Sequence, residues 1–221
     1  MELAAVLAAV AAATLVAVVI VGARKRRQAE FAGMLEQRGW MSLRAGETTT
    51  VTPRSGGWVV RMTRSYAAQQ STRTHIVTSS WSSPSPKTAV GSALVGPSPP
   101  GPLRELAVGL LGSMPDRMAG WLGMDRLDDG KRLRPKDIDD QRLLALATDD
   151  MADVGRMLVL ASTVEDWCAR HPAEREQPVV SISGEGVQVR VRCDVLSSAT
   201  FLQDFVAFGQ RCQALLANAW R

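Results

Sequence analysis

The sequence predicts an α+β fold class, with an N-terminal transmembrane helix followed by a cytoplasmic domain of antiparallel hairpins packed on helices. Three observations favour this prediction. The chain begins with an apolar stretch of bilayer length, its middle and its end hold alternating strand patterns around glycine-containing turns, and amphipathic helical patterns follow the strands. Because the strand patterns come in adjacent pairs and do not alternate regularly with helices, an antiparallel sheet is expected.

The apolar stretch at the N-terminus has the length of a membrane span. Between Leu3 and Gly22 the only polar side chain is Thr14. As an α-helix this stretch is about 30 Å long, which matches the hydrocarbon core of a bilayer. A cleaved signal peptide carries its cations before the apolar core, whereas here Met1 and Glu2 precede it. We therefore expect residues 1–23 to form a retained transmembrane helix, with a cleaved signal or a buried soluble helix as the alternatives.

Positive charge is concentrated at one end of this stretch. Four consecutive cations follow it directly, namely Arg24, Lys25, Arg26 and Arg27. Because Lys and Arg beside a membrane span stay on the cytoplasmic side, we expect a single-pass protein of the cell membrane with its N-terminus outside and its domain in the cytoplasm. The cluster is also expected to contact anionic headgroups, so the lipid bilayer is the first predicted partner.

Small residues recur along the predicted span. Alanine stands at every fourth position in the series Ala5, Ala9, Ala13 and Ala17, which places these side chains on one face of a helix. A stripe of small side chains lets a second membrane helix approach closely. The stripe therefore predicts contact with a membrane protein or self-association, and a chain generally rich in alanine is the alternative explanation.

A short amphipathic helix is expected to follow the span. In the basic amphipathic stalk, residues 24–40, the apolar side chains Phe31, Met34 and Leu35 share one face and charged residues occupy the other. Gly39 is a suitable residue for the C-cap, because glycine readily adopts the left-handed conformation found there. The stalk is thus predicted to connect the span to the domain.

The remaining chain, residues 41–221, is expected to form the cytoplasmic α+β domain. Strand patterns bounded by turn residues lie at 48–53, 58–67, 74–81, 92–96, 142–148 and 178–195, the last forming a hairpin. Helical patterns lie at 103–114, 149–172 and 197–220. The charge-dense segment at 112–141 leaves open whether the domain has one lobe or two, with the break in that segment.

No residue pattern predicts a catalytic, cofactor or metal site. Cys168 and His171 are spaced to reach one ion from a helix end, but a zinc site needs more ligands than these two. The other histidine, His75, lies in a strand pattern with no neighbouring catalytic motif. A calcium loop beginning at Asp125 fails because Lys136 stands where a bidentate glutamate is required. No cofactor is expected.

Composition narrows the partner classes further. The formal net charge is only +4, and the basic cluster after the span accounts for that excess. A nucleic-acid partner is therefore not expected, because binding to nucleic acid needs a basic face across the domain. The three cysteines are scattered, which suits a reducing compartment better than a disulfide framework.

The layout as a whole resembles a known group of proteins. An apolar span, a basic stalk ending in "RGW" at 38–40, a Thr/Ser-rich hairpin, and a C-terminal hairpin followed by a helix ending in "NAW" are found here in that order. This layout resembles a group of uncharacterised single-pass membrane proteins from high-GC Gram-positive bacteria. The resemblance implies a membrane location and no particular activity.

These observations favour a membrane-tethered, non-enzymatic interaction or scaffold protein. Two alternatives remain, a ligand-sensing regulatory domain that acts on a membrane partner and an enzyme whose site the sequence does not reveal. A sizeable apolar cavity between sheet and helices would favour the first alternative. A histidine beside a carboxylate and a hydroxyl in a cleft would favour the second.

Overall fold

A computed structural model defines the fold of the protein. It describes residues 2–69, 72–84, 91–98, 109, 133–136, 138, 142–149, 151, 154–183 and 186–217. Within these ranges, only the backbone is described for residues 2–17, 66–69, 72–75, 154, 156, 216 and 217.

The described strands form one nine-stranded sheet in the order β1-β2-β3-β4-β9-β8-β5-β7-β6. Every neighbouring pair is antiparallel, so the α+β class with an antiparallel sheet is confirmed. The strands are β1 (Trp40–Ala45), β2 (Thr48–Pro53), β3 (Val59–Gln69), β4 (Thr72–Pro84), β5 (Ala93–Pro97), β6 (Arg134–Lys136), β7 (Leu143–Ala147), β8 (Val179–Ser183) and β9 (Gly186–Val191).

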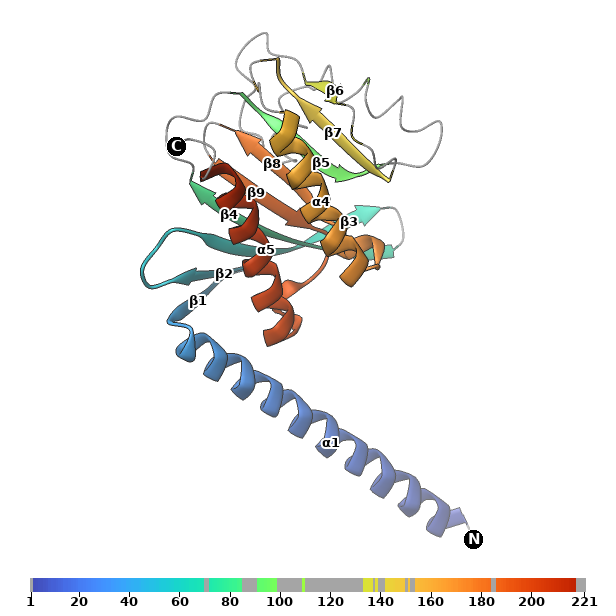
Figure 1. Cartoon of the computed structure of the whole chain (residues 1–221). Coiled ribbons are helices and arrows are strands. Elements are labelled where there is room, and N and C mark those ends of the chain that lie inside the picture. Colours follow the sequence, from blue (N-terminus) through green and yellow to red (C-terminus); the bar gives the residue numbers. More distant parts are fainter. Residues whose placement is uncertain are drawn as a thin grey trace.

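Of the helices for which the structure describes more than one residue, two cover one face of this sheet and a third extends away from it. The helices are α1 (Glu2–Gln37), α4 (Val154–Arg170) and α5 (Ala199–Ala217), with 3₁₀ turns η1 (Glu174–Glu176) and η2 (Val195–Ser197). Figure 1 shows α4 and α5 across the sheet and α1 as a long rod that leaves the domain beside β1. Among the residues whose side chains the structure describes, which in α1 begin at Val18, no helix is both long enough and apolar enough to cross a membrane.

The expected strand patterns appear as strands, but their order in the sheet is not their order in the chain. The β3–β4 hairpin turns between Gln69 and Thr72, and the C-terminal hairpin is β8–β9, both as predicted. This second hairpin lies between β4 and β5, so β4 pairs with β9. Strands from both sides of the segment at 112–141 therefore belong to one sheet.

The hydrophobic core lies between the sheet and the two helices that cover it. Trp81 on β4 and Val189 on β9 are fully buried beneath the helices. The predicted apolar face of α5 supplies Phe205 and Phe208, and α4 supplies Trp167. Because apolar residues alternate along the strands and recur at helical spacing in α4 and α5, each element has one face to bury against the other layer.

The end of α1 packs against this core through the apolar face of the predicted stalk. Met34 is buried, and Phe31 and Leu35 pack partly buried beside it. The helix ends at Gln37, and Gly39 has the positive φ of 64° that favours glycine at a helix C-cap.

The structure departs from the predicted stalk at Trp40 and leaves two other predicted segments undescribed. Trp40, the last residue of the predicted stalk, begins strand β1, which the sequence analysis did not predict. The helix predicted at 103–114 and the loop beginning at Asp125 lie outside the described residues, apart from Gly109, which is helical.

Candidate functional site

A hollow lies where β9 ends, and we call it the β9-end groove. It has a volume of about 610 Å³. Four segments meet there, namely β4, η1, the chain that follows β9, and the start of α5. Its lining residues are Val77, Arg175, Glu176, Arg192, Cys193, Asp194, Ser197 and Phe201.

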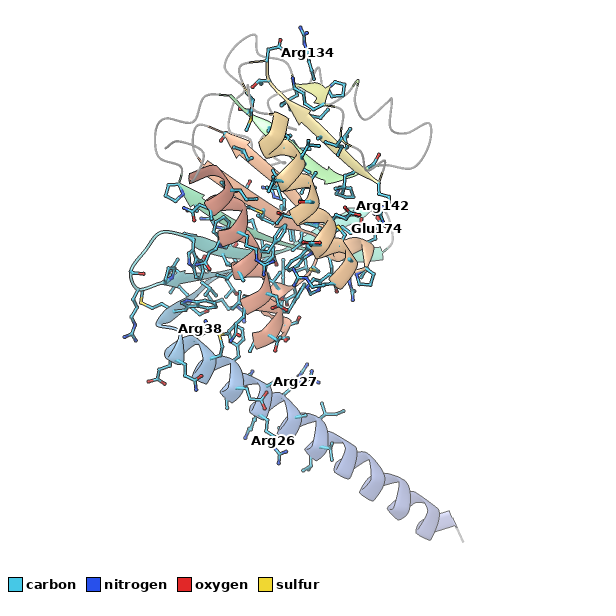
Figure 2. The ribbon with its side chains drawn as sticks, viewed as in Figure 1. Arg26, Arg27, Arg38, Arg134, Arg142 and Glu174 are labelled. Atoms are coloured by element: carbon cyan, nitrogen blue, oxygen red, sulfur yellow. The ribbon has the colours of Figure 1, made fainter. Side chains whose placement is uncertain are left out.

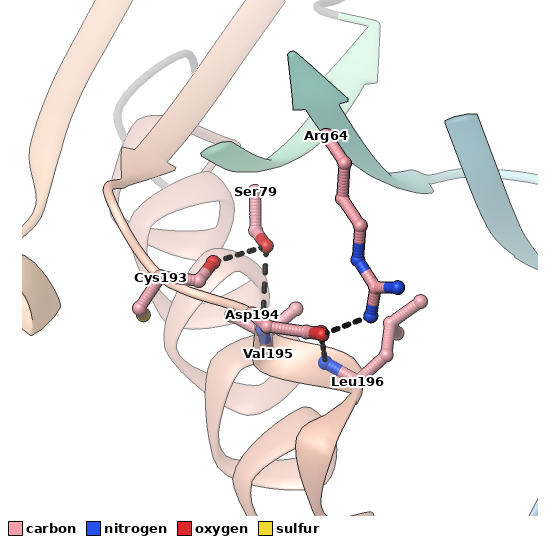
Figure 3. Close-up of polar contacts among 6 residues, drawn as sticks. All are labelled: Arg64, Ser79, Cys193, Asp194, Val195 and Leu196. Atoms are coloured by element: carbon pink, nitrogen blue, oxygen red, sulfur yellow. Dashed lines mark hydrogen bonds and ion pairs between the residues drawn. The ribbon is translucent and has the colours of Figure 1, made fainter. Parts of the chain in front are cut away.

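The groove exists because β4 is much longer than the strand beside it. The β4–β9 ladder begins at Ser79, paired with Val191, and includes no residue of β4 before Ser79. At this point the chain turns away from β4. The buried Ser79 hydroxyl donates to the carbonyl of Cys193 at 2.6 Å and accepts from the amide of Val195 at 3.3 Å. This one side chain therefore satisfies both backbone groups where the ladder stops (Figure 3).

A second side chain fixes the turn that follows. The Asp194 carboxylate accepts from the amide of Leu196 at 2.9 Å, which caps the turn η2. Its other oxygen pairs with the Arg64 guanidinium of β3 at 2.8 Å. Figure 3 shows this carboxylate between the arginine and the backbone of η2. Asp194 thus joins the turn to the β3–β4 hairpin.

The wall of the groove formed by η1 is held from two sides. The amide of Arg192 donates to the carbonyl of Arg175 at 2.9 Å, and the Arg192 side chain pairs with Glu174 at 2.7 Å. On the side that faces the core, the indole nitrogen of Trp167 donates to the carbonyl of Glu176 at 2.8 Å. Because Trp167 belongs to the core, η1 is attached to the rigid part of the domain.

His171 lies next to the groove rather than in its lining. Its ring stacks on Trp167 with centroids 4.1 Å apart and lies 5.2 Å from the ring of Phe201. Its Nδ1 lies 3.8 Å from a carboxylate oxygen of Glu176. The pKa of His171 is lowered, first by burial and then by the neighbouring cation Arg170, so the neutral imidazole is favoured at neutral pH.

The thiol in the groove is not activated for nucleophilic chemistry. Burial raises the pKa of Cys193 to about 12, and the nearby Glu176 raises it further than Arg175 lowers it. A thiol with this pKa stays protonated at neutral pH, whereas nucleophilic attack requires the thiolate. Nucleophilic attack by this thiol is therefore not favoured at neutral pH.

The charged residues that line the groove differ in whether they have ion-pair partners. The two lining carboxylates have charged or titratable partners, since Asp194 pairs with Arg64 and Glu176 faces His171. Among the described residues, no ion pair involves Arg175, which is exposed. The lining of the groove thus holds one cation outside any ion pair of the described residues and one carboxylate, Glu176, whose partner His171 favours the neutral form.

The sequence-predicted residues are not brought together at this site. The basic cluster Arg24, Lys25, Arg26 and Arg27 lies exposed on α1. Figure 2 shows Arg26 and Arg27 on the part of this rod that extends away from the sheet domain. Alanines at positions 5, 9, 13 and 17 lie in the helical part of α1, but their side chains are outside the description.

The two residues considered for metal binding have separate roles in the structure. His171 stacks on Trp167, as described above, while Cys168 lines a different hollow of about 240 Å³ beside Pro97 and Pro172. No group of three potential metal ligands occurs among the described residues. His75 lies in β4, and its side chain is outside the description.

Sequence reasoning missed the groove because its residues form no motif. Its one visible signal is a mismatch in length, since the strand patterns of β3 and β4 are longer than that of β9. This mismatch predicts an unpaired stretch only when β9 is known to lie beside β4.

Comparisons with protein-family models, curated proteins and solved structures give no match to this chain.

Proposed function

We propose that this protein is a membrane-tethered, non-enzymatic interaction or scaffold protein, with α1 in the bilayer, where its small-residue face contacts a partner, and with the sheet domain in the cytoplasm. The proposal rests on the sequence of the N-terminal segment together with the exposure of α1. The layout-level resemblance to uncharacterised single-pass membrane proteins remains a prediction that agrees with it.

The exposure of the apolar residues of α1 carries the proposal. The exposed fractions of Val18, Val19, Ile20 and Val21 lie between 52% and 63%. Four successive residues of an α-helix point around most of its circumference, because each is rotated by about 100° from the last. A helix that is apolar all round is expected in a membrane or inside a protein core, and this domain supplies no core for these residues.

The cations beside this apolar segment favour the cytoplasmic side for the domain. Figure 2 shows Arg26 and Arg27 on the exposed length of α1, between its apolar part and the sheet domain. From Arg27 to the buried Met34 the helix rises about 10 Å. The proposal therefore holds the domain close to the headgroups, with no flexible linker between them.

A crosslinking experiment tests the interaction role. The full-length chain in its native membranes should give a crosslinked complex through the small-residue face of α1. Ala9→Leu and Ala13→Leu should reduce its yield, because leucine prevents close helix approach. Ala11→Leu is the matched control, since residue 11 lies on the other side of the helix from residue 9. Absence of any crosslinked species in the wild-type chain would contradict the interaction role.

A further inference from the structure

We propose that the β9-end groove binds a small zwitterionic ligand, which carries an ammonium group and an anionic oxygen group such as a carboxylate or a phosphate. The ammonium group would contact Glu176, and the anionic group would contact Arg175. This inference goes beyond the proposed interaction role and does not depend on the membrane tether. It follows from the charges of the lining, from the backbone that carries them and from the size of the groove.

The charged side chains of the lining form two groups. The described residues place four of them there, namely Arg175, Glu176, Arg192 and Asp194. Arg192 and Asp194 each belong to an ion pair, with partners outside the lining at 2.7 and 2.8 Å. Arg175 is in no ion pair of the described residues, and Glu176 faces His171, which favours the neutral form. One positive and one negative charge of the lining are therefore left for a ligand.

These two charges lie near the same point of the groove. Both act on the Cys193 thiol, since Glu176 raises its pKa and Arg175 lowers it. Because the effect of a charge weakens with distance, both charged groups lie close to this one side chain. A ligand with a single charge would engage one of them and leave the other to water. A zwitterion would form a charge-assisted contact with each, so its charges complement the lining.

The backbone that carries both residues is held in place. The carbonyl of Arg175 accepts from the amide of Arg192 at 2.9 Å, and the carbonyl of Glu176 accepts from the Trp167 indole at 2.8 Å. The Glu176 carboxylate also lies 3.8 Å from Nδ1 of His171, whose ring stacks on Trp167. A site whose parts are already fixed loses less conformational entropy when a ligand binds.

The groove also has the size and the apolar surface that a small ligand needs. Its volume of about 610 Å³ lies within the range of known ligand sites. Val77 and Phe201 belong to the lining and offer apolar contact to the carbon atoms between the two charged groups of the ligand. The groove thus combines two opposite charges with apolar surface, as binding of a zwitterion requires.

A titration with matched compounds tests the assignment. The probe is O-phosphoethanolamine, measured by isothermal titration calorimetry with the full-length chain in a neutral detergent. Ethyl phosphate lacks the ammonium group, and ethanolamine lacks the phosphate. Each should bind at least about tenfold more weakly than the zwitterion, the loss expected for one charge-assisted hydrogen bond.

Two substitutions assign the charges to their residues. Arg175→Gln should weaken binding of O-phosphoethanolamine by about tenfold and leave ethanolamine binding unchanged, because only the phosphate contact is lost. Glu176→Gln should weaken it by about tenfold and leave ethyl phosphate binding unchanged. The unchanged binding shows in each case that the groove is still folded. Arg211→Gln and Glu47→Gln, at exposed positions outside the groove, are the matched controls and should leave all three affinities unchanged.

Three results would overturn the inference. These are no binding of O-phosphoethanolamine at up to about 10 mM, equal binding of a compound with a single charge, and unchanged affinity in both groove variants. A repeat in nanodiscs with and without phosphatidylethanolamine distinguishes two sources of the same chemistry. Weaker apparent binding in its presence assigns the ligand to the lipid headgroup, and equal binding assigns it to a soluble zwitterion. The crosslinking experiment gives its result independently, so either proposal can fail without the other.

Discussion

Replacing Gly209 by alanine should destabilise the domain, because α5 lies directly on the ring of Trp81 at this residue. A Cβ atom at residue 209 would lie 2.2 Å from Cδ2 of Trp81 and 2.6 Å from both Cε2 and Cε3. Trp81 is fully buried, so the ring has no solvent space into which it can turn. Glycine is thus required for close approach of the helix to the sheet.

The size of the effect follows from two opposing contributions. Carbon atoms in contact prefer separations of about 3.5–4.0 Å, so the helix or the ring would have to move by roughly 1.5 Å. Overpacking of this kind costs about 1–3 kcal/mol, and the overlap here is severe. Alanine regains about 0.8–1 kcal/mol through its higher helix propensity. We expect a net loss of about 2 kcal/mol, which lowers the Tm of a domain of this size by about 4–8 °C.

The assay is thermal unfolding of the full-length variant, followed by circular dichroism. Gly33→Ala is the matched control, because Gly33 also lies in a helix and a Cβ there meets nothing within 4 Å. This control should leave the Tm unchanged or raise it slightly. In a Trp81→Phe background the cost of Gly209→Ala should fall, since the smaller ring leaves room for the new methyl group. A Tm of Gly209→Ala equal to or above the wild-type value would refute the reasoning.

Three further predictions concern the residues around the groove. Ser79→Ala should cost about 1–3 kcal/mol in urea unfolding because two buried backbone groups lose their partner, whereas Ser80→Ala, whose hydroxyl makes only a 3.5 Å contact, should cost almost nothing. Burial raises the pKa of Cys193 and Cys212 to about 12, so the unfolded thiols ionise first as the pH rises. Stability should then fall by about 1.4 kcal/mol per thiol at pH 10, and a Cys212→Ala variant whose alkaline loss matches wild type would contradict this. The pKa of His171 is lowered by burial, so the unfolded state takes up the proton first and stability should decrease as the pH falls below about 6.5. His171→Gln should flatten that decrease, and an unchanged acid limb in pH-dependent unfolding would count against it.

The local elements could be predicted because their patterns are local. Val187 and Val189 alternate with polar residues in β9, and Leu202, Phe205 and Cys212 recur at helical spacing in α5. A repeat of two residues in a strand, or of 3.6 residues in a helix, identifies the buried side chains without reference to the rest of the chain. These elements therefore appear where the sequence predicts them.

The arrangement of the strands could not be predicted in the same way. The pairing of β4 with β9 joins Ser79 to Val191, residues far apart in the sequence, and many strands could satisfy the same alternation. Strand β1 was missed because Met41 and Leu43 remain exposed, so no burial pattern marks it. Neighbours in a sheet are chosen by packing across the whole domain, which a single-sequence pattern does not contain.

The candidate groove depended on that same long-range information. Ser79 reads in the sequence as one serine among several in a polar strand, and its role appears only where the chain after β9 turns away from β4. Likewise, Arg175 joins the groove only because the amide of Arg192, after β9, donates to its carbonyl. Residues of ordinary types became a candidate site through their placement.

The most direct test of the account is the topology of the full-length chain in cells. The chain should remain in the membrane pellet after an alkaline carbonate wash. Protease added to intact spheroplasts should leave the sheet domain uncut, while protease added to inverted vesicles should digest it. Neutral replacement of Arg24–Arg27 should give a mixture of both orientations. Release of the wild-type chain by carbonate, or digestion of its domain in intact spheroplasts, would contradict the central claim.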